Sequence, residues 1–342
     1  MRRLHFLVGV ALAVAPIVFL AGCRDRGSEA EPAPASPSVA ADSPSPVGGG
    51  TPSTDSNPAA TSTPRPLQFE TGTTRGTIRH DGLERSYRLY VPTQAGEGSN
   101  LALVVALHGG LGSGDQLAET SRFEDLAEAE GFVIAFPDGV DRTWNAGACC
   151  GGAARTDIDD VGFLAALIEH LAATLPVNRE RVFITGHSNG AMMTFRFACQ
   201  RSEMVAAAAP VAGSLEIPVC TPATGVDLLT IHGDSDRNHP IEGGEGTRSI
   251  SGVSYVSMEE SMRRWTTGFA CTSVPSTVVE GALTTTTWSG CAGGTTASLV
   301  VIAGADHPWP GGKMPARTTS LQGTPSQELD ATRAVWEFFE SR

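Results

Sequence analysis

Val182-Phe183-Ile184-Thr185-Gly186-His187-Ser188-Asn189-Gly190 is the stretch of sequence that decides the fold. Three apolar residues and a threonine lead into the motif Gly-x-Ser-x-Gly, and a helical pattern begins near Ala191. In a strand–turn–helix of this kind the serine occupies a strained turn, and its hydroxyl stands above the sheet. Small residues must flank that turn, and Gly186 and Gly190 supply them. The stretch therefore predicts a nucleophile at Ser188.

Continuous apolar runs recur on both sides of this stretch and alternate with helical patterns. Strands that helices cover on both faces show such runs, whereas half-exposed strands alternate apolar and polar residues. The alternation predicts one α/β domain with a mostly parallel sheet and helices on both faces. The expected strands are a hairpin at 77–91 and apolar runs at 101–107, 132–136, 182–185, 205–212, 228–232 and 298–302. The expected helices lie near 115–130, 161–175 (with Asp157 as N-cap), 189–201, 254–266 and 327–340.

A serine nucleophile needs a base within hydrogen-bond reach. In strand–turn–helix hydrolases the chain order is serine, acid, histidine. His307 follows the strand at 298–302 and lies at a C-terminal strand edge, where open α/β sheets bind ligands. His239 is too close to the expected acid loop to face Ser188. We therefore expect His307 to be the base.

The acid should follow the strand at 228–232, in the sequence His232-Gly233-Asp234-Ser235-Asp236. Asp236 is favoured over Asp234, because Asp234 is suited to turning the loop through its own backbone. The acid would hold the tautomer of the base and stabilise its imidazolium form. We expect buried His232 to be a structural residue.

The developing oxyanion also needs hydrogen-bond donors. The N–H of Asn189 is the first, because it follows the nucleophile. The second should come from the glycine-rich loop at 108–112, where the backbone can approach a substrate closely. Gly110 and Leu111 are the candidates.

Acidic residues cluster at Asp157, Asp159 and Asp160, a pattern that also suits a metal site. Helix capping explains it better, so we expect no metal. The net charge is -13 and the pI is near 5.0, so a broad nucleic-acid surface is not expected.

The N-terminus carries its own pattern. Residues 1–22 combine two arginines, an apolar run and small residues at the exit, as a signal peptide does. The sequence Leu20-Ala21-Gly22-Cys23 resembles the bacterial lipobox, which implies lipidation of Cys23 and an anchor in the membrane. The alternative is an ordinary cleaved signal peptide and a secreted protein. Residues 23–66 are rich in Pro, Ser and Thr and predict a disordered linker, which leaves 67–342 as the catalytic domain.

Six cysteines remain besides Cys23, an even number that agrees with an oxidising compartment. The helix that Ser188 opens runs toward the N-terminal edge of the sheet, where the next strand starts, and cysteines at both places suit a disulfide. Two others flank an expected hairpin. The expected pairs are Cys199 with Cys220 and Cys271 with Cys291, while Cys149 and Cys150 form either a vicinal pair or two free thiols.

Several motifs together extend beyond Gly-x-Ser-x-Gly. They include R-x-Y-x-L-Y-V-P at 85–92, L-H-G-G at 107–110, F-P-D-G at 136–139, W-N-A-G-x-C-C-G at 144–151, D-D-V-G-F at 159–163, S-N-G-x-M-M at 188–193 and H-x-W-P-G at 307–311. With these motifs the chain resembles carbohydrate esterase family 1, which holds secreted feruloyl esterases, acetylxylan esterases and polyhydroxybutyrate depolymerase-like proteins.

The resemblance implies an α/β-hydrolase fold and hydrolysis of carboxylic esters without a cofactor. Carried over by residue, it supports Ser188, Asp236 and His307. It also places Trp144 and Trp309 near the pocket, either as surfaces for a sugar or phenolic acid or as packing residues. Two departures from the family are the extra carboxylate at Asp234 and the sequence Asn238-His239-Pro240-Ile241 after the acid.

Three functions compete at this point. The first is an extracytoplasmic esterase, expected as a monomer, that releases feruloyl or acetyl groups from a polysaccharide such as xylan. The second is hydrolysis of polyhydroxybutyrate or its oligomers. The third is an envelope lipoprotein that uses a hydrolase fold only for binding. The third predicts loss of a catalytic residue, whereas all three are present.

Overall fold

The structure, a computed structural model, describes residues 69–96, 98–314 and 323–342. All of these residues belong to one compact unit. The expected signal peptide, Cys23 and the linker lie outside them, so these expectations stay predictions. Within the described ranges, none of the helices combines the length and the apolar character that crossing a membrane requires.

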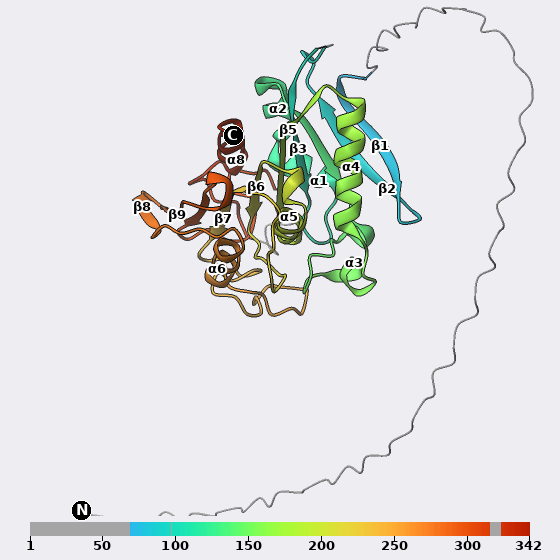
Figure 1. Cartoon of the computed structure of the whole chain (residues 1–342). Helices are drawn as coiled ribbons and strands as arrows, with labels where there is room; N and C mark the ends of the chain where they lie inside the picture. The colour runs from blue at the N-terminus through green and yellow to red at the C-terminus, as the bar shows by residue number, and fades with distance from the viewer. Residues whose placement is uncertain (1–68, 97, 315–322) are drawn as a thin grey trace, which may run out of the picture. The chain divides into compact units, whose positions relative to one another are not determined.

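A ten-stranded sheet runs through the unit in the order β1-β2-β4-β3-β5-β6-β7-β10-β9-β8 (Figure 1). The central six strands are parallel, and an antiparallel hairpin flanks them on each side. The parallel strands are β3 (Leu101–Leu107), β4 (Val133–Pro137), β5 (Val177–His187), β6 (Ala207–Val211), β7 (Asp227–Gly233) and β10 (Ala297–Ile302). The hairpins are β1 (Gly72–His80) with β2 (Leu83–Val91), and β8 (Ser276–Glu280) with β9 (Leu283–Trp288).

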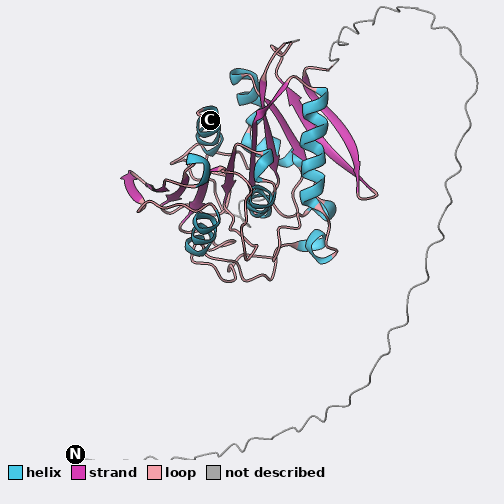
Figure 2. Cartoon of the chain, in the orientation of Figure 1, coloured by secondary structure: helices cyan, strands magenta, loops and turns pink. Residues whose placement is uncertain are grey.

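Helices cover both faces of the sheet, as the sequence predicts (Figure 2). One face packs against α4 (Asp160–Thr174), α5 (Asn189–Gln200) and α6 (Met258–Gly268). The other face packs against α1 (Gly114–Ser121), α2 (Phe123–Glu130) and α8 (Ala331–Glu340). Shorter elements are α3 (Gly151–Arg155), η1 (Val140–Arg142), η2 (Ser202–Met204) and η3 (Ala292–Gly294).

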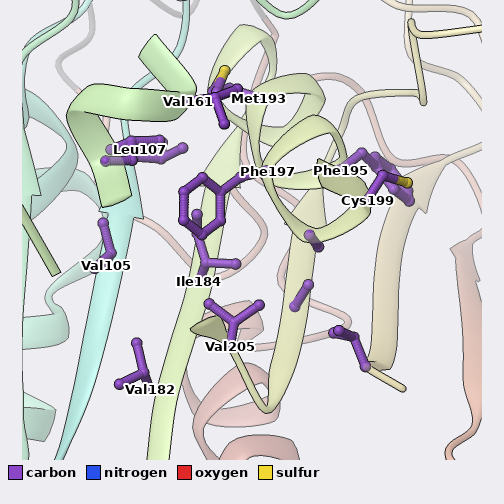
Figure 3. Close-up of a cluster of buried hydrophobic side chains, with 14 of the residues drawn as sticks. Val105, Leu107, Val161, Val182, Ile184, Met193, Phe195, Phe197, Cys199 and Val205 are labelled. Carbon is purple, nitrogen blue, oxygen red and sulfur yellow. The ribbon is translucent and has the colours of Figure 1, made fainter. Parts of the chain in front are cut away.

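Strand β3 shows why its apolar run is continuous. Leu103, Val105 and Leu107 belong to the core under α4 and α5, whereas Ala102, Val104 and Ala106 belong to the core under α1 and α2. Successive side chains of a strand point to opposite faces, so a strand between two helix layers must be apolar on both. In the first core, Val105 and Leu107 lie across from Phe197 of α5 (Figure 3). Full burial of each such side chain stabilises the fold by about 1.5–3 kcal/mol.

Two expectations about helices are wrong in detail. The helix expected at 115–130 is two helices, because Arg122 adopts a left-handed conformation with φ 59°. The N-cap of α4 is Asp159 rather than Asp157, and its carboxylate accepts the N–H of Gly162 at 2.9 Å. Asp157 lies in a left-handed turn before the helix, with φ 49°. Helical periodicity locates a helix better than it locates its first residue.

Three disulfides link the six cysteines of the domain. Cys199 is joined to Cys220 and Cys271 to Cys291, which are the pairs expected from the sequence. The structure also joins Cys149 to Cys150, the first of the two alternatives for these neighbours. The Cys199–Cys220 disulfide fastens the C-terminal end of α5 to the segment that precedes β7, so it holds the helix that follows the candidate nucleophile.

Candidate active site

Ser188 occupies a sharp turn between β5 and α5. Its backbone has φ 56° and ψ −119°, a conformation that costs free energy for any residue other than glycine. A Cβ atom on Gly190 would collide with the carbonyl oxygens of Leu107 and His108, so close packing on β3 requires a glycine there. The turn leaves Ser188 partly exposed at the C-terminal edge of the sheet, where the sequence predicts the nucleophile.

The structure brings Ser188, His307 and Asp236 together from three strands. The Oγ of Ser188 lies 2.9 Å from Nε2 of His307, and Nδ1 of His307 lies 2.7 Å from Oδ2 of Asp236. His307 and Asp236 are each 4% exposed. Asp236 follows β7 and His307 follows β10, and these two strands are parallel neighbours. Their C-terminal ends therefore meet at one edge, beside the turn after β5.

Asp236 is held as an ionised hydrogen-bond acceptor. Its Oδ1 accepts the backbone N–H groups of Asn238 and His239 at 2.9 and 2.8 Å. Burial acts to raise the pKa of Asp236, but the charge and hydrogen bond of His307 outweigh burial and hold that pKa well below its usual range. The neighbouring Asp234 instead accepts the N–H of Gly304 at 2.7 Å. Asp234 thus joins two loops, and Asp236 faces His307, the candidate base.

Two further histidines lie beside Ser188, His307 and Asp236, and each is hydrogen-bonded to a backbone carbonyl. Nε2 of His187 donates to the carbonyl of His307, and Nε2 of His232 donates to the carbonyl of His239, each at 2.9 Å. Burial, followed by the charge of His307, lowers the pKa of His187 to about 4. Burial also lowers the pKa of His232. The expectation that His232 is structural agrees with this bonding, whereas the contact of His187 with the His307 loop has no signal in the sequence.

The candidate oxyanion donors behave differently from one another. Asn189 begins α5, so its N–H is one of the groups that a helix leaves without an intrahelical partner. Gly110 lies beside it, because a Cβ on Gly110 would be 3.7 Å from the Cβ of Asn189. Leu111 is a wrong candidate, since its N–H donates to the carbonyl of Arg142 at 2.8 Å. Gly110 and Asn189 therefore remain as the donors to consider.

The expectation that Trp144 and Trp309 offer flat surfaces to a substrate is not supported by their positions. Trp144 is 0% exposed and its indole N–H donates to the carbonyl of His108 at 2.9 Å. Trp309 is 1% exposed and its indole N–H donates to Oγ1 of Thr332 at 3.0 Å. The packing alternative fits both residues, because indoles that are enclosed and hydrogen-bonded have no free face.

The loop that contains Trp144 is attached to the nucleophile turn by a pair of hydrogen bonds. The N–H of Trp144 donates to the side-chain oxygen of Asn189 at 2.7 Å, and the side-chain amide of Asn189 donates to the carbonyl of Trp144 at 3.0 Å. Asn189 thus fixes the neighbouring loop through its side chain, while its backbone N–H remains a candidate oxyanion donor.

The acidic cluster near the start of α4 has structural roles. Asp159 caps α4, Asp157 accepts from the side chain of Asn145 at 3.0 Å, and Asp160 pairs with Arg85 at 2.7 Å. Each carboxylate points to a different partner. Across the residues that the structure describes, no group of three or more His, Cys, Asp or Glu side chains has the arrangement of a metal site.

A hollow lies beside the candidate oxyanion loop. It is lined by all three glycines of that loop, by residues of α1 and by His187. The residues at this hollow include Gly109, Gly110, Gln116, Thr120, His187 and Met314. A second hollow, between α2 and α8, is lined by residues such as Asp125 and Arg333 and includes no member of the Ser188 group.

Comparison with known proteins connects this geometry to a group of esterases. A family model described as Esterase PHB depolymerase matches residues 85–263. A putative esterase, NocK, from Nocardia uniformis subsp. tsuyamanensis is 30% identical over 79% of this chain and 83% of its own length. Feruloyl esterase B of Piromyces equi is 28% identical over 62% of this chain, and the chain spans 40% of the length of that protein.

Solved structures show the same architecture. An acetyl xylan esterase from Aspergillus awamori aligns with a TM-score of 0.52 at 19% identity, and the alignment covers 69% of this chain and 94% of that one. At this identity the likeness concerns the fold alone. It confirms the α/β-hydrolase fold that the sequence predicts.

Proposed function

The chain belongs to the Esterase PHB depolymerase family of carboxylic ester hydrolases, and we propose that it is a serine esterase that works through Ser188, His307 and Asp236. The observation that carries the proposal is the continuous hydrogen-bonded line from Ser188 Oγ through His307 to Asp236, with distances of 2.9 and 2.7 Å. Nucleophile, base and acid in this order form the arrangement that activates a serine hydroxyl.

In the proposed mechanism Ser188 Oγ attacks the ester carbonyl carbon while His307 Nε2 accepts the hydroxyl proton. The negative charge that forms on the carbonyl oxygen is stabilised by the backbone N–H groups of Gly110 and Asn189. His307 then gives the proton to the departing alcohol, which leaves an acyl group on Ser188. Water, activated by His307, hydrolyses that acyl-enzyme in the second half of the reaction. Asp236 keeps the imidazole oriented and stabilises its cationic form.

For the substrate, we propose feruloyl or acetyl esters of a plant polysaccharide such as xylan. The similar proteins support this class, since their names include feruloyl esterases and acetylxylan esterases. A second candidate is an oligomer of polyhydroxybutyrate, because the matching family is described by that activity. The burial of Trp144 and Trp309 weakens the argument for an aromatic platform that binds sugar.

We also propose that the enzyme works outside the cytoplasm, tethered through Cys23 by the linker at 23–66. The disulfides at Cys199–Cys220 and Cys271–Cys291 support an oxidising compartment, where such bonds persist. Labelling cells with radioactive palmitate tests the anchor. The expected label disappears in a Cys23→Ala variant, and equal labelling of that variant would contradict the lipid attachment.

The proposed activity is tested with a fluorophosphonate probe and a panel of esters. The panel contains methyl ferulate, acetylated xylan, short p-nitrophenyl esters and hydroxybutyrate oligomers. Wild type should react with the probe and hydrolyse at least one ester, whereas Ser188→Ala should do neither. Ser235→Ala is the matched control, because that exposed serine lies on the loop of Asp236. Absence of labelling in wild type, or equal labelling of Ser188→Ala, would favour the binding-protein alternative.

A further inference from the structure

The loops after β7 and β10 carry the acid and the base, and they must keep a fixed spacing. Asp236 belongs to the first loop and His307 to the second, and the 2.7 Å contact between them depends on how the loops sit together. Near the ends of the strands the two loops are joined by Asp234, which accepts the N–H of Gly304, and by the N–H of Ser235, which donates to the carbonyl of Ala305 at 3.1 Å.

Asp306 joins the same two loops at the level of the catalytic residues themselves. Its Oδ1 accepts the backbone N–H of Arg237 at 3.2 Å and the backbone N–H of His307 at 3.0 Å. One oxygen atom of Asp306 therefore connects Arg237, which follows the acid Asp236, to the base His307. The side chain of Asp306 is 9% exposed, so few water molecules compete for these hydrogen bonds.

The second oxygen of Asp306 is occupied by two guanidinium groups. Oδ2 accepts from Nε of Arg237 at 3.1 Å and also contacts Nη2 of that residue, and Nη1 of Arg248 lies at 3.4 Å. The carboxylate of Asp306 thus contacts five N–H groups at once, two from the backbone and three from the guanidinium groups. They also offset its negative charge, so the contribution of Asp306 to His307 is mainly geometric.

We propose that Asp306 is a positioning residue that sets the distance and orientation of His307 relative to Asp236. The inference rests on the proposed function of Ser188, His307 and Asp236. It assigns to Asp306 no contact with substrate. Because Asp234 and Ser235 join the loops independently, loss of the Asp306 bridge should leave the domain folded and relax only the geometry at His307. A misplacement of a catalytic group by about 1 Å lowers turnover by about 100-fold.

The test uses Asp306→Asn in the full chain, with a short p-nitrophenyl ester as substrate. The amide has the same shape, but its NH₂ group would face a guanidinium or a backbone N–H, so the arrangement of five donors around one carboxylate is lost. We expect kcat per active site, counted with the fluorophosphonate probe, to fall about 10- to 100-fold. KM should stay within about twofold, because the substrate contacts are unchanged. Arg248→Gln is the control and should keep kcat within about twofold, since both backbone contacts of Asp306 persist.

Each outcome decides the question. A kcat of Asp306→Asn within twofold of wild type overturns the proposal, and so does a loss confined to KM, which would indicate a substrate contact. If Asp306→Asn does not fold, Asp306→Glu replaces it: the charge is kept while the acceptor moves by one methylene, and a normal kcat in that variant overturns the proposal. If Ser188→Ala keeps the turnover of wild type, the proposed function is wrong, and the role of Asp306 is not the cause of the failure.

Discussion

The guanidinium of Arg85 lies 2.7 Å from the carboxylate of Asp160, 75 positions later in the chain, and both side chains are buried. The other oxygen of Asp160 accepts the N–H of Asn145 at 2.8 Å. Arg85 also stacks over the ring of Phe163, 3.8 Å from its centroid. The pair thus connects strand β2, helix α4 and the loop of Trp144, which is attached in turn to Asn189. The buried ion pair thus holds the loop that contacts Asn189, the residue after the candidate nucleophile.

Replacing Arg85 with methionine should destabilise the protein strongly. The variant leaves the Asp160 carboxylate buried without its cation, and burial already raises the pKa of Asp160 while Arg85 is present. We expect the free energy of unfolding in urea to fall by about 3–5 kcal/mol. Arg75→Met is the control, because Arg75 pairs with Asp115 at the surface and is 63% exposed. That variant should lose less than about 1 kcal/mol. Equal losses in the two variants would contradict a special role for the buried pair.

Replacing Asp236 should lower kcat far more than replacing Asp234. Asp236→Asn keeps the size of the side chain but cannot stabilise the imidazolium form of His307, so kcat should fall about 10³- to 10⁴-fold. Asp234→Asn can still accept the N–H of Gly304 and should keep kcat within about threefold. Steady-state kinetics with a p-nitrophenyl ester measures both. A larger loss in Asp234→Asn than in Asp236→Asn would reverse the assignment of the acid.

Much of this arrangement could be predicted because it depends on order along the chain. Ser188, Asp236 and His307 each follow an apolar run, and C-terminal ends of neighbouring parallel strands meet at one edge. The apolar runs themselves are readable because strands between two helix layers must be apolar on both faces. A rule about strand ends therefore locates these three residues without any knowledge of their distances.

The details that the sequence does not predict depend on contacts between distant loops. The N–H of Leu111 is used by a carbonyl at Arg142, and no local pattern reveals that contact. Trp144 and Trp309 lie in loops, where periodicity says nothing about which way an indole turns. The contacts of Asp306 with both loops could not be predicted either, because a single acidic residue before a histidine forms no recognisable motif.

Removing the disulfide between Cys199 and Cys220 should lower stability. The bond joins cysteines 21 positions apart, and loss of such a constraint on the unfolded chain costs about 3 kcal/mol. The double variant Cys199→Ala/Cys220→Ala should show this loss in urea unfolding of the oxidised protein. After complete reduction the two proteins should approach one another in stability. The same stability in both oxidised proteins would mean that this bond is absent or without effect in solution.

Acid should destabilise the protein well above the pH at which its carboxylates protonate, because buried histidines are held neutral. The pKa of His187 is lowered from 6.5 to about 4, mainly by burial. The unfolded chain therefore binds a proton at His187 before the folded chain does, and this contribution to stability is complete above pH 6.5 and is lost as the pH falls toward 4. His108, His232 and His239 have pKa values lowered by burial and act in the same direction. In His187→Gln, whose amide can still donate to the carbonyl of His307, the difference in unfolding free energy between pH 7 and 4.5 should shrink by about 2 kcal/mol.

The exposed His170→Gln is the control and should leave that difference unchanged. Urea unfolding at the two pH values measures both variants, and an unchanged pH dependence in His187→Gln would show that His187 is protonated as readily in the folded protein as in the unfolded chain.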